Sequence, residues 1–175
     1  LPPRSTLFPY TTLFRSGSDS TNITKSEIHE EESAFSFDGK SIAFVVTDGR
    51  YSAIWTMDAD GKNRKQLTED GMNAYSPSWS PDGTKIVFCM GSGSNVQLYV
   101  VNADGSGIAQ LTKDAMMKSR PSWSPDGKKI AYSAFTGNIE TDRDIFVMNA
   151  DGSNPVNITN SRGLDDFPAW SPVLK

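Results

Sequence analysis

A seven-residue motif, PSWSPDG, is repeated along this chain of 175 residues. Complete copies stand at residues 77–83 and 121–127, and altered copies stand at residues 34–39 and 168–172. The aspartates of the first three copies, Asp38, Asp82 and Asp126, recur at intervals of 44 residues. A fixed period of this size is the sequence signature of stacked supersecondary units. The sequence therefore predicts a tandem array rather than one irregular domain.

A second marker, an apolar residue followed by threonine, sets the limits of the repeat. Ile23, Leu67 and Leu111 carry this marker at the same spacing of 44 residues. The fourth copy, Ile158, follows after 47 residues, so three extra residues lie in the last unit, most simply in the loop 136–143. Within residues 18–175, we expect repeat units at about residues 33–68, 76–112 and 120–159, with partial strands at both ends.

Each unit has the pattern of four short β-strands. In the second unit the segments rich in β-branched and aromatic residues are Pro77–Ser80, Lys85–Cys89, Val96–Val101 and Ile108–Thr112. This composition, over short runs bounded by turn residues, is typical of strands. No window of ten or more residues shows the periodicity of a helix. The unit is therefore predicted to be a four-stranded antiparallel meander.

The motif Ser-Pro-Asp-Gly contains the residues that a tight turn requires. Proline holds its own φ at about −65°, and the glycine that follows the aspartate can adopt the positive φ that ends the turn. Together they predict a type I turn with a glycine bulge between antiparallel strands. Asp82, Gly83, Asp126 and Gly127 are therefore expected to be structural. Their spacing does not match the ligands of a calcium-binding EF-hand loop.

Apolar residues fall on both faces of the second and third strands of each unit. A sheet with one face in water would alternate, so we expect neighbouring units to cover both faces. Trp79, Trp123 and Trp170 precede the turns and are predicted to wedge between units, with a large buried area. Four-stranded units of this period, stacked face to face, are the blades of a β-propeller.

The residues of the repeat also resemble those of a known family. The order P-x-W-S-P-D-G, K-x-I-A-[FY], [IL]-[YF]-V-M-N-A-D-G and Q-L-T resembles the WD-like repeat of TolB-type β-propellers. The resemblance covers residues 22–172 and recurs in three units. Phe35 stands at the tryptophan position of the first unit, and Val173 and Leu174 replace Asp and Gly in the last.

We therefore expect an all-β fold of about three and a half four-stranded blades that do not close a ring. Partial strands at residues 22–24 and 166–171 bring the expected number of strands to about fourteen. Propellers close with about four to eight blades, and the resembled family commonly has six. Residues 1–17 fit no part of the repeat and resemble translated sequencing-adapter sequence, so we expect a non-native or disordered leader there. Open blade edges would favour self-association.

Several classes of function are disfavoured. A net charge of −4 with dispersed Lys and Arg argues against nucleic acid, and no apolar run is long enough to span a membrane. The one histidine, His29, lies in a charged run between predicted strands, and the one cysteine, Cys89, lies in an apolar strand. No nucleophile motif G-x-S-x-G occurs. We expect no catalytic residue, no metal and no cofactor.

A ligand is expected at the edge of the blades opposite the hairpins. The loops there, after the second and fourth strands, differ between units, and variable loops on a repeated scaffold commonly carry recognition. Tyr75, Arg120 and Phe167 hold corresponding places near the mouth of the central channel. With Asp165 and Asp166 they are the candidate binding residues, and plain solvent exposure is the alternative.

The resemblance implies a non-enzymatic scaffold that binds a protein or peptide on this loop face. TolB-type proteins of the Tol-Pal envelope system are periplasmic, so the resemblance also implies a periplasmic or other extracytoplasmic location, although no signal peptide is visible. The alternative is the gating or specificity propeller of a larger hydrolase, such as a prolyl-oligopeptidase-like peptidase.

Overall fold

Twelve β-strands and no helix are found in the computed structural model, among the residues that it describes, 22–24, 26, 29–137 and 142–171. Consecutive strands form three four-stranded antiparallel sheets. Blade 1 contains β1 (His29–Phe35), β2 (Ser41–Thr47), β3 (Ser52–Asp58) and β4 (Lys65–Gln66). Blade 2 contains β5 (Ala74–Trp79), β6 (Lys85–Met90), β7 (Gln97–Asn102) and β8 (Ala109–Gln110). Blade 3 contains β9 (Lys118–Trp123), β10 (Lys129–Phe135), β11 (Arg143–Asn149) and β12 (Val156–Asn157).

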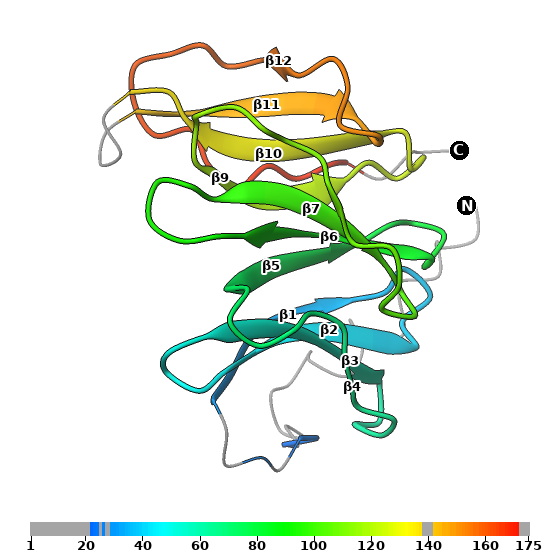
Figure 1. The fold of residues 1–175 in the computed structure, drawn as a ribbon. Helices are drawn as coiled ribbons and strands as arrows, with labels where there is room; N and C mark the ends of the chain where they lie inside the picture. The colour runs from blue at the N-terminus through cyan, green and yellow to red at the C-terminus, as the bar shows by residue number, and fades with distance from the viewer. Residues whose placement is uncertain (1–21, 25, 27–28, 138–141, 172–175) are drawn as a thin grey trace, which may run out of the picture.

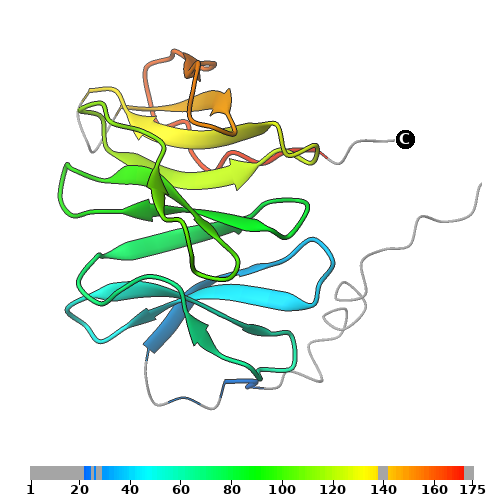
Figure 2. The ribbon, with the colours of Figure 1, turned by 45° about the vertical axis from the view of Figure 1, so that its right-hand side comes forward.

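The blades are stacked face to face in chain order, with blade 2 between the other two (Figure 1). The first strands contact one another, β1 with β5 and β5 with β9, whereas the fourth strands make no mutual contact within the described ranges. The blades therefore fan out from an axis near the first strands, as the turned view shows (Figure 2). This is an open, incomplete β-propeller, as the sequence predicts.

Both hairpins of each blade have the predicted turn. In the first hairpin of blade 2, Gly83 has a φ of 70° and its N–H donates to the carbonyl of Ser80 at 2.9 Å. The Ser80 hydroxyl donates to Asp82 at 2.6 Å and accepts from the N–H of Lys85 at 2.9 Å. The Ser-Asp turn thus satisfies its own polar groups within the hairpin, whereas the turn after β7 also accepts a hydrogen bond from Lys65 of blade 1 at the carbonyl of Asp104.

Two apolar cores lie between the blades. The core between blades 1 and 2 consists of Ala43, Val45, Ile54, Leu67, Ala74, Trp79, Ile86, Phe88 and Val101. The core between blades 2 and 3 includes Val87, Cys89, Val96, Leu98, Trp123, Ile130, Tyr132, Ala134, Phe146 and Met148. Burying one large apolar side chain contributes about 1.5–3 kcal/mol. Blade 2 is therefore held by apolar contacts on both of its faces, as its sequence pattern indicates.

Blade 1 has one face that no other sheet of the described residues covers. Ile42, Phe44 and Met57 form a small cluster there, beside a pocket of about 320 Å³ that Ile23 also lines. Ile23 lies against the second hairpin of blade 1 at Gly61, as Leu111 lies against Gly152 of blade 3. Residues 22–24 therefore take the place of the fourth strand of a preceding blade.

The expected number of fourteen strands is wrong for the described residues. Residues 22–24 and 166–171 contain no strand. Trp170 nevertheless donates through Nε1 to the carbonyl of Ser122 at 3.0 Å, as Trp79 does to Ala34 at 3.1 Å. The segment 166–171 follows the course of a first strand, but no second strand lies beside it to complete the hydrogen-bond ladder.

The first strands begin earlier than predicted. The residue pattern predicts that the first strand of blade 2 starts at Pro77, but β5 starts at Ala74. A bulge explains the difference, since Ser76 and Pro77 both lie opposite Phe88 and pairing continues on either side of them. Proline is tolerated at a bulge of an edge strand. In the same way, β1 includes His29 and the acidic residues after it, which were expected between strands.

Two predicted features fall outside the described residues. They are the leader, residues 1–17, and residues 138–141 of the longest loop. The expectations for these segments therefore remain predictions. Within the described ranges, no helix of sufficient length and apolar character to cross a membrane occurs.

Candidate binding sites

The two edges of the blade stack are built differently. The hairpin edge carries the turns after the first and third strands, and the loop edge carries the connections after the second and fourth strands. The turns repeat almost the same residues in every blade, whereas the loops differ in length and composition. Pockets or clustered polar groups occur at both edges, so each edge is a candidate site.

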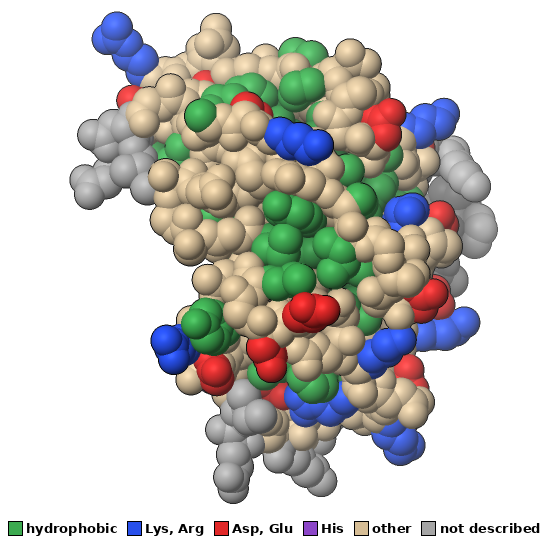
Figure 3. Space-filling model, viewed as in Figure 1, with side chains coloured by type: hydrophobic (Ala, Val, Ile, Leu, Met, Phe, Trp, Pro, Cys, Tyr) green, Lys and Arg blue, Asp and Glu red, His purple; other side chains and the backbone are tan. Residues whose placement is uncertain are grey.

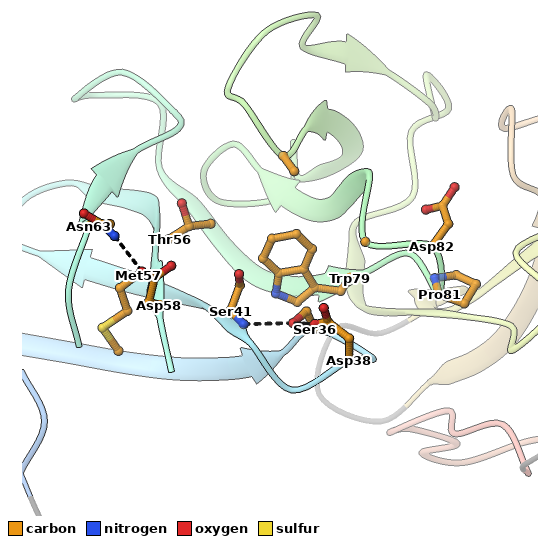
Figure 4. A pocket seen from close by; sticks show the side chains of 12 residues that line it. Ser36, Asp38, Ser41, Thr56, Met57, Asp58, Asn63, Trp79, Pro81 and Asp82 are labelled. Atoms are coloured by element: carbon orange, nitrogen blue, oxygen red, sulfur yellow. Dashed lines mark hydrogen bonds between the residues drawn. The ribbon is translucent and has the colours of Figure 1, made fainter. Parts of the chain in front are cut away.

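A pocket of about 300 Å³ opens on the hairpin edge between blades 1 and 2 (Figure 4). The indole of Trp79 lies near the middle of the lining residues, with Asp38, from the turn of blade 1, and Asp82, from the turn of blade 2, on one side of it (Figure 4). On its far side Asn63 donates through Nδ2 to Asp58 at 2.6 Å. The pocket therefore has an aromatic centre and an acidic, hydrogen-bonded rim.

A larger pocket, of about 580 Å³, lies in the equivalent place between blades 2 and 3. Trp123 and Leu111 contribute apolar surface, and Lys85 and Asp126 contribute charge. Trp123 is 6% exposed, and its Nε1 has no hydrogen-bond partner in the described part of the chain. The sequence analysis did not identify either pocket, because each forms only where turns of two different blades meet.

The turn carboxylates of the hairpin edge are engaged within their own turns. The hydroxyl of Ser80 and the N–H of Thr84 hold the pKa of Asp82 below its ordinary value. The hydroxyl of Ser124 and the N–H of Lys128 do the same for the pKa of Asp126. Among the described residues, no group of three or more His, Cys, Asp or Glu is placed to hold a metal ion. The geometry indicates turn formation at this edge.

Three of the predicted binding residues meet on the loop edge beside blade 3. Arg120 of β9 forms an ion pair with Asp166, and its guanidinium carbon lies 3.9 Å from the centroid of the Phe167 ring. Arg143 of β11 forms an ion pair with the same carboxylate oxygen, and its guanidinium carbon lies 4.1 Å from the centroid of the Phe135 ring. Two guanidinium groups thus converge on one carboxylate, and each covers an aromatic ring.

Asp166 is held by four donors. Its Oδ2 accepts from Arg120 and Arg143, and its Oδ1 accepts from the Ser133 hydroxyl at 2.7 Å and the Phe167 N–H at 2.9 Å. Burial alone would raise the pKa of Asp166, but these hydrogen bonds outweigh it and lower the pKa. A carboxylate offers about four acceptor sites. Its contacts therefore fit the positioning of the two arginines better than direct contact with a ligand.

Asp165 and Phe167, the residues on either side, face different surroundings. The Asp165 carboxylate accepts from the Ser161 hydroxyl, and its N–H donates to the carbonyl of Arg143 at 2.8 Å. Phe167 is 71% exposed, more than any other large hydrophobic residue described. Arg120, with a side chain 38% exposed, is its neighbour. Phe167 is therefore the most exposed of the predicted residues in this cluster, and Arg120 lies over its ring with part of its side chain in solvent.

Tyr75 belongs to a separate pocket of the loop edge. This pocket, of about 500 Å³, is also lined by Met117 and by residues 91–94 of the loop after β6. Tyr75 is half-buried opposite Cys89, and burial raises the pKa of its hydroxyl. Burial also raises the pKa of the Cys89 thiol to about 12, which makes a reactive thiolate unavailable. The five predicted residues therefore lie in two places rather than one.

The sequence analysis missed a strained backbone position that all four copies share. Glu32, Ser76, Arg120 and Phe167 have φ values between 49° and 59°, a region that non-glycine residues seldom occupy. The first three are the bulge residues of β1, β5 and β9. A residue before proline is normally extended, and proline follows all but Glu32. No local sequence signal therefore predicts this conformation.

Charged side chains do not gather by sign on the face shown in Figure 3. Lys and Arg are interspersed there with Asp and Glu, and hydrophobic side chains lie together near the middle of the face. Nucleic-acid binding requires a clustered basic surface, and this face does not present one. The local pair of arginines beside blade 3 is therefore a more specific feature than the overall charge.

The comparisons with known proteins agree with this architecture. The profile of the TolB beta propeller domain matches residues 12–172. A proposed TolB from Agrobacterium tumefaciens has a TM-score of 0.69 and 26% identity, over 77% of this chain and 50% of that one. TolB from Acinetobacter baumannii has a TM-score of 0.70 and 23% identity, over 83% of this chain and 36% of that one. A prolyl endopeptidase has a TM-score of 0.63 and 13% identity, over 83% of this chain and 24% of that one.

The chain spans half or less of the length of each of these three structures. No curated protein matches it. The likenesses below 25% identity support the fold alone, whereas the family profile covers most of the chain and the same repeat recurs in all three blades. The chain therefore belongs to the TolB β-propeller domain family.

Proposed function

We propose that the chain is a non-enzymatic, protein-binding section of a TolB-type propeller, and that it binds a peptide or protein segment at the loop edge. The observation that carries this proposal is the pair Arg120 and Phe167, which joins β9 to the segment after blade 3 and stays open to solvent. Arginine and aromatic side chains dominate binding hot spots. The bonds from Arg143 and Ser133 to Asp166 fix the pair before a ligand arrives, which lowers the ordering cost of binding.

Family membership supports two further parts of the proposal. TolB-type propellers act outside the cytoplasm, so we place this one in the periplasm or another extracytoplasmic compartment. The uncovered face of blade 1, with its cluster of Ile42, Phe44 and Met57, favours self-association of the isolated chain. Size-exclusion chromatography over a range of concentrations measures this, and a monomer at every concentration would contradict it.

A peptide-display selection tests the binding role. Peptides selected from a random library on the intact chain should lose binding to Phe167→Ala, because the substitution removes the exposed ring. Phe37→Ala is the matched control, since Phe37 is also exposed, at 41%, but lies in a turn of the hairpin edge. Peptides that depend on Phe37, or on neither ring, would overturn the proposed site.

A second function is favoured by the fold likeness to the prolyl endopeptidase, of which the chain covers 24%. On this alternative the blades gate or select substrates for a hydrolase domain elsewhere in a longer protein. The full reading frame separates the two functions. An α/β-hydrolase region with G-x-S-x-G after the blades supports the peptidase, and a small α/β domain before them supports the TolB-type role.

A further inference from the structure

The left-handed bulge position is occupied by four different residue types, none of them glycine. In each blade the bulge places two residues of the first strand opposite one aromatic residue of the second strand. The first of the two bulge residues is Glu32 opposite Phe44, Ser76 opposite Phe88, or Arg120 opposite Tyr132. Glycine is the usual residue of a left-handed bulge, because it has no Cβ. Strained non-glycine positions cluster at functional sites. The strain therefore directs attention to what these side chains do.

At two of the three bulges the side chain contacts the corresponding residue of the next copy of the repeat. The Glu32 carboxylate accepts from the N–H of Ser76 at 2.6 Å and from its hydroxyl at 3.3 Å. The Arg120 guanidinium covers the ring of Phe167, the fourth member. Because the first strands lie nearest the axis, the four positions form a row near the mouth of the channel. Glu32, Ser76, Arg120 and Phe167 are named the bulge row below.

The bulge row changes in character along its length. It begins with an exposed carboxylate at Glu32 and ends with an arginine and an exposed aromatic ring. Beside that last part, Arg120 and Arg143 share the single carboxylate of Asp166. Arg120 uses only Nη1 for this contact, so its Nη2 and Nε have no hydrogen-bond partner among the described residues. One end of the row therefore has spare donors and positive charge.

We propose that the pair Arg120 and Phe167, at one end of the bulge row, determines ligand specificity at the loop edge, and that this pair accepts a carboxylate that lies beside an apolar side chain. This inference rests on the proposed peptide-binding function. The guanidinium fork offers two parallel N–H donors to a carboxylate. The Phe167 ring supplies apolar area next to that contact, and Asp166 with Arg143 holds the pair in place. A peptide in which acidic and aromatic residues alternate combines both features.

Fluorescence anisotropy with three labelled octapeptides tests the inference. They alternate phenylalanine with aspartate, asparagine or lysine, so they differ mainly in charge. If the Arg120 guanidinium bonds to the peptide carboxylate, the intact chain should bind the aspartate peptide at least about tenfold more tightly than the asparagine peptide. The lysine peptide should have the lowest affinity of the three. Equal affinity for all three peptides would overturn the inference.

Glycine substitution separates recognition from folding. Arg120→Gly should abolish the preference for the aspartate peptide while the chain still folds, since glycine relieves the left-handed φ and so offsets part of the loss of the contacts with Asp166 and Phe167. Ser76→Gly is the matched control, because it relieves the same strain at the same bulge position and should leave the preference unchanged. If Arg120→Gly does not fold, Arg120→Gln answers the same question with a side chain of similar reach and no charge.

Two results would overturn the inference without touching the proposed function. One is Phe167-dependent binding of all three peptides with no preference for acid. The other is a preference for the aspartate peptide that survives in Arg120→Gly or Arg120→Gln. If the intact chain binds no peptide through Phe167, so that Phe167→Ala changes no affinity, the proposed function itself is contradicted.

Discussion

The hairpin edge and the loop edge are made by the same strands, yet their side chains interact in opposite ways. On the hairpin edge, Ser80 and Asp82 bond within one turn, and the same arrangement recurs at Ser36 with Asp38 and at Ser124 with Asp126. On the loop edge, Asp166 bonds to Ser133 and to arginines of two different strands. The first edge is built from local contacts that repeat, and the second from distant contacts that occur once.

The difference shows how a repeat protein separates stability from specificity. The hydrogen bonds between serine and aspartate can be copied into every blade, because both partners lie in one turn. A contact between Arg120 and Phe167 cannot be copied in this way, since both partners must change together. The repeated edge therefore stabilises the array, and the variable edge is free to acquire a ligand. Substitutions at the two edges should therefore differ in what they cost.

Trp123→Ala should have the largest effect, because Trp123 is buried between blades 2 and 3 at the hairpin edge. Truncating a buried tryptophan typically costs about 3–5 kcal/mol of unfolding free energy. Trp170→Ala is the matched control, since Trp170 is only half-buried at the open end of the stack and should cost less. Urea unfolding measures both, and a Trp123→Ala chain as stable as the wild type would refute the wedge role.

Gly152→Ala should cost about 2–4 kcal/mol, from the left-handed φ and from overpacking together. Gly152 has a φ of 87°, and an added Cβ would lie 2.5 Å from the carbonyl oxygen of Leu111 in the preceding blade. Gly83→Ala is the control, since Gly83 has a φ of 70° with open space around it and should cost only about 1–2 kcal/mol. Equal losses in thermal unfolding would mean that the contact between blades is unimportant.

Asp166→Ala should destabilise the loop edge by about 1–3 kcal/mol, because it leaves the donors of Arg120, Arg143 and Ser133 without their acceptor. Asp165→Ala removes a neighbouring carboxylate that accepts from one hydroxyl, so it should cost less. Urea unfolding of the two variants gives the comparison. A larger loss for Asp165→Ala would show that the network around Asp166 is not what holds this segment.

Protonation of the turn carboxylates at acid pH should lower the free energy of unfolding by less than any of the substitutions above. The folded-state pKa values of Asp38, Asp82 and Asp126 are lowered from 3.8 by hydrogen bonds within their turns. A lowered folded pKa adds stability above the ordinary pKa, and this stability is lost as the pH falls through the folded value. Unfolding free energy measured from about pH 5 down to about pH 2 should therefore decrease.

The variant Asp82→Asn with Asp126→Asn sharpens the acid prediction. Asparagine can accept the same turn hydrogen bonds but does not titrate in this range. The double variant should therefore lose less stability between neutral and acid pH than the wild type. Identical pH profiles would show that the turn carboxylates do not contribute to the acid sensitivity.

Much of the fold follows from local patterns in the sequence. The period of 44 residues, the turns that end in Gly83 and Gly127 and the apolar residues on both strand faces predict four-stranded blades in a stack. The strand limits were less accurate, because the bulge at Ser76 and Pro77 lets β5 continue past a residue that normally ends a strand. A ladder interruption of this kind depends on the partner strand.

The candidate site was only partly accessible from the sequence. Variation between the loops predicts Arg120 and Phe167 as binding residues, and in the structure the guanidinium carbon of Arg120 lies 3.9 Å from the centroid of the Phe167 ring. The same reasoning grouped Tyr75 with them, although it lines another pocket. Arg143 could not be predicted, because in the sequence it is one of many dispersed charges. Only the position of β11 in the fold places it beside Asp166.

The blade is encoded locally, because its turns and strand patterns depend on residues close together in the chain. Which distant side chains meet depends on how the strands pair and the blades stack. That packing separates the Arg120 cluster from the pocket of Tyr75 and creates the left-handed bulge row, since a bulge and an ion pair across strands are properties of two chain segments at once. Neither segment carries that information alone.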